Sequence, residues 1–243
     1  MNDFRAELYK TYVSVFKSKI ASYSDEDVKK QWEWADYKYL QLLQKYPKDA
    51  KILEIGCGPG FFLEYLKNRG YDNALGIDFS EEQIAFADKR GVKAIAGDAL
   101  QFLKSCSNDY DIILAFDFIE HFSKDELIIL SRDIYNALAP GGMLLLHTPN
   151  AQGLFPNRII HGDLTHLTIF NPNSIVQLFG SAGFTGIEVF ETGPVPKDIK
   201  GRLRLAAWRL LKVFLNLLKT IESGGGISIW TQDMIGVCYK GKP

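Results

Sequence analysis

Four histidines are the side chains of this chain best suited to moving a proton near neutral pH. Because the ordinary pKa of histidine is about 6.5, its ring can take a proton from a hydroxyl or amine that is about to form a new bond. His121 follows an apolar run typical of a buried strand, and we expect it to be the base. His166 lies in a Pro-, Asn-, Gly- and His-rich stretch, and it either joins the site or braces that stretch. His147 ends an apolar strand, so we expect it to face the core.

A glycine-rich turn over residues 52–60 (ILEIGCGPG) breaks a buried-type strand and leads into a helix. Glycines at such a turn let the backbone approach a ligand closely. The nicotinamide fingerprint G-x-G-x-x-G is not matched, because Phe61 occupies the place of its third glycine. The turn therefore indicates a ligand held close to the backbone, but its pattern departs from that of a dehydrogenase.

Two aspartates follow this turn, each at the end of a predicted strand. Asp78 ends the run NALGID, and Asp98 ends the next apolar run. A carboxylate at the carboxyl edge of a parallel sheet can accept two hydrogen bonds from a ribose diol. Taken alone, each aspartate is also a good helix cap. Their order after the glycine turn, on one predicted sheet edge, favours ligand contacts.

This series of motifs resembles the class I S-adenosylmethionine-dependent methyltransferases. The resemblance extends from about residue 51 to residue 147, more weakly to Tyr239, and rests on E-x-G-x-G-x-G and on the turn LAPGG over 138–142. It implies a doubly wound, Rossmann-like α/β fold with a seven-stranded, mostly parallel sheet and an antiparallel edge strand. It also implies S-adenosyl-L-methionine as methyl donor, S-adenosyl-L-homocysteine as product, and donor contacts from Glu54, Gly56, Cys57, Gly58, Gly60, Asp78, Phe79, Asp98, Ala99 and Phe116.

The segment DFIEH, residues 117–121, is similar to the metal-binding E-x-x-E-H of small-RNA terminal methyltransferases and of some quinone-pathway O-methyltransferases. In a helical turn, Asp117, Glu120 and His121 share one face, and a magnesium ion held there would polarise the accepting oxygen. Here Asp117 replaces the first glutamate, and we favour a hydrogen-bonded loop anchor over a magnesium site. His161 and Asp163 are further polar candidates nearby in the chain.

The resemblance favours O-methylation of a small molecule such as a sugar or glycan hydroxyl. Methyl transfer from a sulfonium needs a positioned nucleophile and a desolvated site, and a hydroxyl nucleophile also needs a base, for which we expect His121 and His166. Three alternatives stay open. They are a quinone- or phenol-type O-methyltransferase assisted by magnesium, a nucleic-acid methyltransferase, and a non-catalytic protein that binds S-adenosylmethionine.

Short apolar runs alternate with helical stretches after residue 50, which predicts a parallel sheet with helices on both faces. Residues 1–50 predict an N-terminal helical cap, and 51–243 predict the methyltransferase domain. Within that domain, the stretch 148–170 is too long for an ordinary connection and predicts an active-site lid. The last two strands predict an edge hairpin that contains an insertion, residues 193–230.

The insertion contains a basic amphipathic segment. Apolar residues follow a helical stripe over 203–221, and residues 197–219 hold seven Lys or Arg and one Asp. Such a helix can lie on an anionic membrane surface. The alternative, which we favour at this stage, is a helix packed on its own domain or on a partner chain.

The whole chain of 243 residues has a formal net charge of −1, which disfavours a nucleic-acid partner. Its three cysteines are far apart and show no zinc-ligand spacing, which indicates a reducing compartment. The N-terminal residues do not resemble a secretory signal, and no run is long and apolar enough to span a membrane. We therefore expect a cytoplasmic protein, a monomer or homodimer that acts on a small-molecule acceptor.

Overall fold

The computed structural model describes residues 4–10 and 25–241. Seven strands form one sheet in the order β3-β2-β1-β4-β5-β7-β6. Their bounds are β1 Ile52–Ile55, β2 Ala74–Asp78, β3 Ala94–Ala96, β4 Tyr110–Phe116, β5 Leu138–Pro149, β6 Thr185–Glu191 and β7 Asp233–Tyr239. The first five strands pair in parallel, and β7 runs antiparallel to both β5 and β6. The expected doubly wound sheet and its terminal hairpin are confirmed, with β6 outermost and the antiparallel β7 beside β5.

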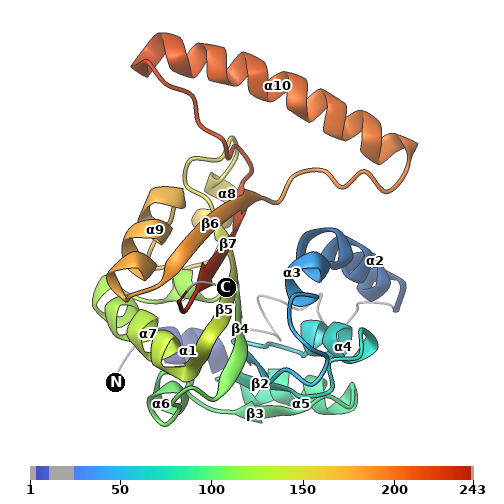
Figure 1. Cartoon of the computed structure of the whole chain (residues 1–243), viewed down its shortest axis with the longest axis vertical. Helices are drawn as coiled ribbons and strands as arrows, with labels where there is room; N and C mark the ends of the chain where they lie inside the picture. The colour runs from blue at the N-terminus through green and yellow to red at the C-terminus, as the bar shows by residue number, and fades with distance from the viewer. Residues whose placement is uncertain (1–3, 11–24, 242–243) are drawn as a thin grey trace.

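Helices cover both faces of this sheet (Figure 1). Their bounds are α1 Phe4–Lys10, α2 Asp25–Ala35, α3 Gln41–Leu43, α4 Phe61–Asn68, α5 Glu81–Lys89, α6 Ala99–Lys104, α7 Lys124–Ala137, α8 Asn157–Ile160, α9 Pro172–Ser181 and α10 Ile199–Ser223. A π-helical turn, η3 Asp36–Leu40, joins α2 to α3, and a 3₁₀ turn, η4 Ile119–His121, follows β4. Among these helices, none combines the length and apolar composition needed to cross a bilayer.

Two apolar layers form because successive side chains of a strand point to opposite faces. Leu53 of β1 and Ile113 of β4 face the layer shared with α6, α7 and α9. Ile52 and Ile112, one position earlier in each strand, face the layer shared with α4 and with the segment from α2 to α3. The strands β1 and β4 are therefore buried on both faces, which explains their continuous apolar sequence.

The residues predicted to form the N-terminal cap pack against two different parts of the domain. Arg5 of α1 lies against α7, where its guanidinium pairs with Glu126 at 2.6 Å. The segment from α2 to α3 instead packs beside α4, where Asp36 accepts hydrogen bonds from Arg69 and from Tyr65. The part of the predicted cap over 11–24 lies outside the described residues.

The insertion between β6 and β7 contains α10, the longest helix in the described part of the chain (Figure 1). Asp198 caps its first turn by accepting a hydrogen bond from the Gly201 amide, and Gly224 ends it with a positive φ of 75°. Figure 1 shows α10 extending well clear of the sheet. The connections that follow β1, β2, β3, β4 and β5 lie at the carboxyl edge of these parallel strands, where chemically active groups are expected in this type of sheet.

Candidate functional site

The turn between β1 and α4 has the backbone geometry that its glycines predict. Gly56, Gly58 and Gly60 all have positive φ angles, of 71°, 53° and 76°. A Cβ atom on Gly60 would lie 2.8 Å from the Val92 side chain, so the third glycine is required for packing as well as for conformation. The turn therefore brings bare backbone to the carboxyl edge of β1.

Asp78 fixes this turn from the end of β2. Its carboxylate accepts hydrogen bonds from the amides of Gly58 and Ser80, each at 2.9 Å, and from the Gln83 side chain at 3.3 Å. Burial raises the pKa of Asp78, while these three hydrogen bonds act in the opposite direction. The carboxylate that we expect to bind ribose is thus already part of the framework of the glycine turn.

A cavity of about 600 Å³ lies at the carboxyl ends of β2 and β3. Tyr9, Phe79, Ser80, Glu81, Glu82, Ala96 and Gly97 line it. Phe79 is 57% exposed, and its ring centroid lies 6.2 Å from that of Tyr9. Two aromatic rings beside the Asp78 carboxylate give a concave surface on which a planar base and a polar sugar can both be bound.

Other residues of the predicted donor set have structural partners. Asp98 caps α6 by accepting a hydrogen bond from the Leu100 amide at 2.8 Å, and Ala99 is buried behind it. The Phe116 ring stacks on Tyr39 at 5.0 Å. Their contacts with a donor stay predictions.

Glu54 and Cys57 are buried close to the turn. One carboxylate oxygen of Glu54, Oε2, has no hydrogen-bond partner among the described residues. Burial, together with repulsion from Asp78, raises the pKa of Glu54 well above its usual range. Burial also raises the pKa of the Cys57 thiol. An unpaired buried oxygen is costly, so Glu54 is a group that a ligand amide or ammonium would satisfy.

Asp117 and His147 form a pair at the ends of β4 and β5. Asp117 has a positive φ of 47°, which is uncommon for a residue other than glycine, and its carboxylate lies 2.7 Å from Nδ1 of His147. Burial lowers the pKa of His147, but the attraction and hydrogen bond of Asp117 outweigh it and raise the pKa to about 9. His147, which we expected to face the core, has a side chain that is only 17% exposed, and its ring also pairs with Asp117 at the sheet edge.

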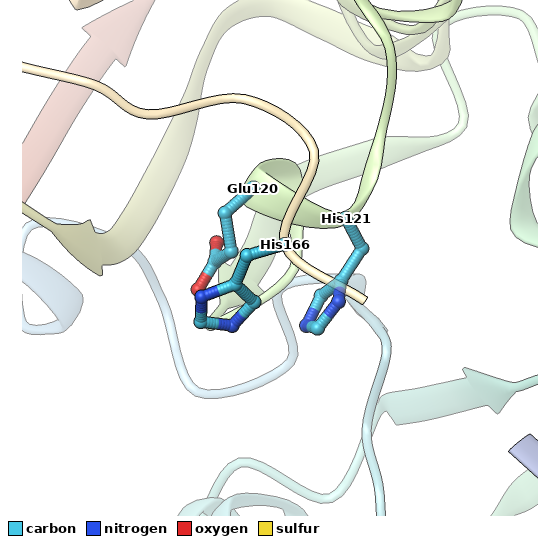
Figure 2. A group of neighbouring side chains, drawn as sticks. All are labelled: Glu120, His121 and His166. Carbon is cyan, nitrogen blue, oxygen red and sulfur yellow. The ribbon is translucent and has the colours of Figure 1, made fainter. Parts of the chain in front are cut away.

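The predicted grouping of Asp117, Glu120 and His121 is not the one that the fold makes. The Asp117 side chain contacts His147 instead. Glu120 and His121 converge with His166, which lies in the long loop between β5 and α9 (residues 150–171). One possible metal-ligand atom of each of these three residues lies within 4.8 Å of the others (Figure 2). Glu120 Oε1 and His166 Nδ1 are buried and have no hydrogen-bond partner in the described structure. One carboxylate and two imidazoles suit a transition metal better than magnesium, which prefers oxygen ligands.

The protonation of His121 follows from its partners. The Thr165 hydroxyl donates to Asp163 at 2.6 Å, so it accepts from Nδ1 of His121, which lies 2.8 Å away. This arrangement assigns the proton to Nδ1 and leaves Nε2 as the basic nitrogen. Burial, with a smaller effect from His166, lowers the pKa of His121 to about 4. His121 is therefore neutral at physiological pH, as a general base must be.

The long loop and α1 close this cluster. Leu167 and Thr168 donate their amides to the Glu120 carbonyl at 2.8 and 3.1 Å, which fixes the loop on η4. The ring centroid of Tyr9, on α1, lies 6.1 Å from that of His121. Tyr9 also lines the cavity at the ends of β2 and β3, which we call the donor-side cavity. Neither Tyr9 nor Thr165 could be identified from the sequence, because both reach the site through contacts with residues far away in the chain.

A second cavity, of about 470 Å³, lies between α2, the long loop and the insertion. Four aromatic rings line it, those of Trp34, Phe155, Trp208 and Trp230. Its charged lining consists of Lys30, Glu33, Lys197 and Arg204. The Trp34 ring also contacts His147 edge-on, with centroids 6.3 Å apart, so this cavity adjoins the Asp117–His147 pair.

Comparison with known proteins places these features in a family context. A family profile described as "Methyltransferase domain" matches residues 25–189. The human "Probable tRNA methyltransferase 9B" is 29% identical over 148 residues, which cover 60% of this chain and 31% of that protein. The "Ubiquinone biosynthesis O-methyltransferase" of Pseudomonas aeruginosa is 30% identical over 106 residues, or 41% of this chain and 44% of that protein. The chain thus spans about a third to a half of the length of these curated relatives.

Solved structures share the fold at low sequence identity. A "SAM dependent methyltransferase" from Archaeoglobus fulgidus superimposes with a TM-score of 0.65 at 21% identity, covering 86% of this chain and 94% of that one. "Phosphoethanolamine N-methyltransferase 2" from Haemonchus contortus, solved with S-adenosyl-L-methionine, gives a TM-score of 0.61 at 19% identity, covering 96% of this chain and 60% of that one.

Proposed function

The chain belongs to the family of S-adenosylmethionine-dependent methyltransferase domains, and from this premise we propose that it methylates an oxygen of a small-molecule acceptor. The observation that carries the proposal is His121. With the ring proton assigned to Nδ1, Nε2 is the nitrogen that can accept a proton, and the ring lies beside Glu120 Oε1 and His166 Nδ1, two buried atoms without a hydrogen-bond partner in the described structure. Such a cluster can receive an acceptor hydroxyl and its proton.

The donor is S-adenosyl-L-methionine, and we assign it to the glycine turn and the cavity beside it. In this assignment the methionine part lies along Gly56–Gly60, the ribose diol bonds to Asp78, and the adenine lies against Phe79 with Asp98 at its edge. The exposed ring of Phe79 and the inward carboxylate of Asp78 support it.

The transfer is an in-line displacement. The acceptor O–H bond breaks as its proton passes to Nε2 of His121, the new O–CH₃ bond forms, and the S–CH₃ bond breaks to leave a neutral thioether. Because the leaving group departs uncharged, the protein supplies a base and positioning only. Asp163 and Thr165 orient the His121 ring through Nδ1, and they stabilise it when it becomes charged.

The proposal is tested by transfer of labelled methyl from S-adenosyl-L-methionine to fractionated cell extract. We expect His121→Ala to slow transfer by about 10²- to 10⁴-fold, which is the usual contribution of a general base, while the donor Kd stays unchanged. His161→Ala, an exposed loop histidine, is the matched control and should retain activity. Full activity of His121→Ala contradicts the role of the base. Donor binding without methyl transfer to any fraction contradicts the proposal that the protein methylates a small-molecule acceptor.

The second cavity bears on the class of acceptor. Its four aromatic rings can hold a planar ring, and Arg204 can bind an anionic group, whereas Lys197 already pairs with Glu33 at 2.8 Å. The relatives described above name tRNA and ubiquinone biosynthesis, and neither supports the sugar or glycan hydroxyl that the sequence resemblance favours. We therefore place a phenol- or quinone-type acceptor ahead of a sugar.

A tRNA acceptor is the second candidate, because two relatives are named as enzymes that act on tRNA. One is the human protein described above. The other is "tRNA U34 carboxymethyltransferase" from Desulfotalea psychrophila, which is 25% identical over 199 residues that cover 76% of this chain and 61% of that protein. A nucleic-acid complex would weaken steeply with salt. Binding of labelled tRNA at 50 and 200 mM salt separates the candidates. A loss of about 10³-fold or more favours tRNA, and no binding at either concentration excludes it.

A further inference from the structure

Helix α10 turns an apolar face away from the rest of the protein. Its large apolar side chains are exposed in a row: Ile199 78%, Leu203 67%, Leu210 76%, Phe214 55%, Leu217 58% and Ile221 75%. Their separations of three, four and seven residues put them on one side of the helix. A continuous exposed apolar strip of this length indicates a contact surface.

The opposite side of α10 holds the helix in this orientation. Lys212 pairs with the Glu191 carboxylate at 2.6 Å, and the Trp208 indole lies 3.5 Å from the same carboxylate. One helical turn further, the Asn216 side chain accepts a hydrogen bond from the Trp230 indole at 3.3 Å. Because these contacts lie on one face, the apolar strip faces outward.

Basic side chains border the apolar strip. By helical spacing, Lys200 and Arg204 lie along one edge of it, and Arg202 and Arg209 lie along the other. All four are exposed. Glu222, near the end, is the acidic residue of the helix. A second copy of α10 packed on this strip would bring like charges together, whereas an anionic lipid surface complements both the apolar strip and its basic borders.

We infer that α10 docks the protein on an anionic lipid bilayer, with the apolar strip buried among the upper acyl chains and the four border cations at the head groups. This inference goes beyond the proposed methyl transfer and does not depend on it. The helix lies in the plane of the surface, because its polar face remains attached to Glu191 at the end of β6 and to Trp230 just before β7. Arg204 and Trp208 also line the second cavity, so docking brings that cavity next to the lipid head groups.

The inference is tested by flotation of the full chain with two kinds of vesicle. One contains phosphatidylcholine alone, and the other contains phosphatidylcholine with phosphatidylglycerol. We expect the protein to float with the anionic vesicles and to be released as salt is raised, because screening weakens attraction between the cations and the lipid. Equal flotation with both vesicles, or none with either, overturns the inference.

Matched variants locate the contact. We expect Arg202→Gln/Arg209→Gln to lower the vesicle partition constant roughly 30-fold, since each cation near an anionic surface contributes about a five-fold change. Leu210→Ser/Phe214→Ser should abolish flotation. The controls are Arg132→Gln and Ile128→Ser/Ile129→Ser, exposed substitutions on α7 that should leave flotation unchanged.

Sedimentation and circular dichroism complete the test. All variants should keep the same melting curve, since the substituted side chains are largely exposed in the described structure. A chain that dimerises in solution, becomes monomeric with Leu210→Ser/Phe214→Ser, and does not float would show that a second copy covers the strip. That result overturns docking on lipid while leaving the proposed methyl transfer untouched.

Discussion

At the scale of single residues, the site depends on polar groups that the protein buries at a cost. Glu54, Glu120 and His166 each keep a buried polar atom without a hydrogen-bond partner in the described structure. Such atoms destabilise a folded protein unless a ligand satisfies them, and they concentrate where ligands bind. Glu54 lies beside the glycine turn, and Glu120 and His166 lie beside His121. Trp32, Tyr71, Glu82 and Asp133 also keep such an atom among the described residues, so the assignment of a donor side and an acceptor side rests on the geometry of the proposed site.

The Asp117–His147 pair gives a prediction for pH. Because the pKa of His147 is raised to about 9, its pairing stabilises the folded state fully below the unfolded pKa of about 6.5, and this contribution is lost as pH rises through 9. We expect Asp117→Asn to lower the pKa of His147 by about 1–3 units, since the opposite charge is removed while burial remains. Ring-proton NMR across pH 5–10 measures the shift. Asp72→Asn, at an exposed loop aspartate, is the control, and an unchanged pKa in Asp117→Asn would contradict the pairing.

At the scale of elements, α1 connects the donor-side cavity with the cluster of Glu120, His121 and His166. It carries Tyr9, which lines the donor-side cavity and contacts His121. Arg5 attaches the helix through hydrogen bonds to the His121 carbonyl at 2.8 Å and to Glu126. Glu126 in turn belongs to the capping box of α7 with Ser123. A seven-residue helix has little stability of its own, so these contacts keep it in place.

Removal of the Arg5 side chain should therefore release α1. Because hydrogen bonds to a partly buried charged group each contribute about 1.5–3 kcal/mol, we expect Arg5→Ala to lower the free energy of unfolding by roughly that amount and to weaken donor binding as Tyr9 leaves the cavity. Urea titration and calorimetry measure the two effects. The exposed Arg132→Ala on α7 controls for loss of charge. Donor affinity equal to that of the unaltered protein would show that α1 does not cover the donor.

At the scale of the whole molecule, the fold is a single sheet with helices packed on both faces and further segments at its carboxyl edge. β1 and β4 are buried on both faces; Asp117 and Glu120 follow β4 directly, and Asp78 ends β2, which pairs with β1. The long loop and α1 add the remaining groups from outside this framework. Such an arrangement holds catalytic side chains at set positions on a stable scaffold.

Ligand binding should accordingly stabilise the entire fold. S-adenosyl-L-homocysteine at 100 times its Kd should add about 2.7 kcal/mol to the free energy of unfolding, or roughly 5–10 °C in Tm for a chain of this size. In Asp78→Ala the shift at the same concentration should shrink, while Asp88→Ala, an exposed residue of α5, should behave like the unaltered protein. No shift with this ligand, together with a shift from NAD, would contradict the assignment of the donor.

Much of the donor side could be predicted from sequence, because its residues are close in the chain. The glycine turn, the strand-terminal Asp78 and Asp98, and the strand and helix alternation depend on local spacing, and the structure has the expected elements in the expected order. The acceptor side could not be predicted in the same way. Spacing alone grouped Asp117 with Glu120 and His121, but the positive φ of Asp117 turns its side chain to His147.

The sequence by itself determined which elements form and which of their faces are apolar, since both follow from periodicity within a dozen residues. It thereby determined the sheet, the glycine turn and the amphipathic character of α10. The tertiary structure decided which distant side chains meet. His166 reaches Glu120 from the long loop, Arg5 crosses to the His121 carbonyl, and α10 keeps its apolar strip outward. These contacts between distant side chains depend on how whole elements pack. Packing depends on all of the buried surface together rather than on any local sequence pattern.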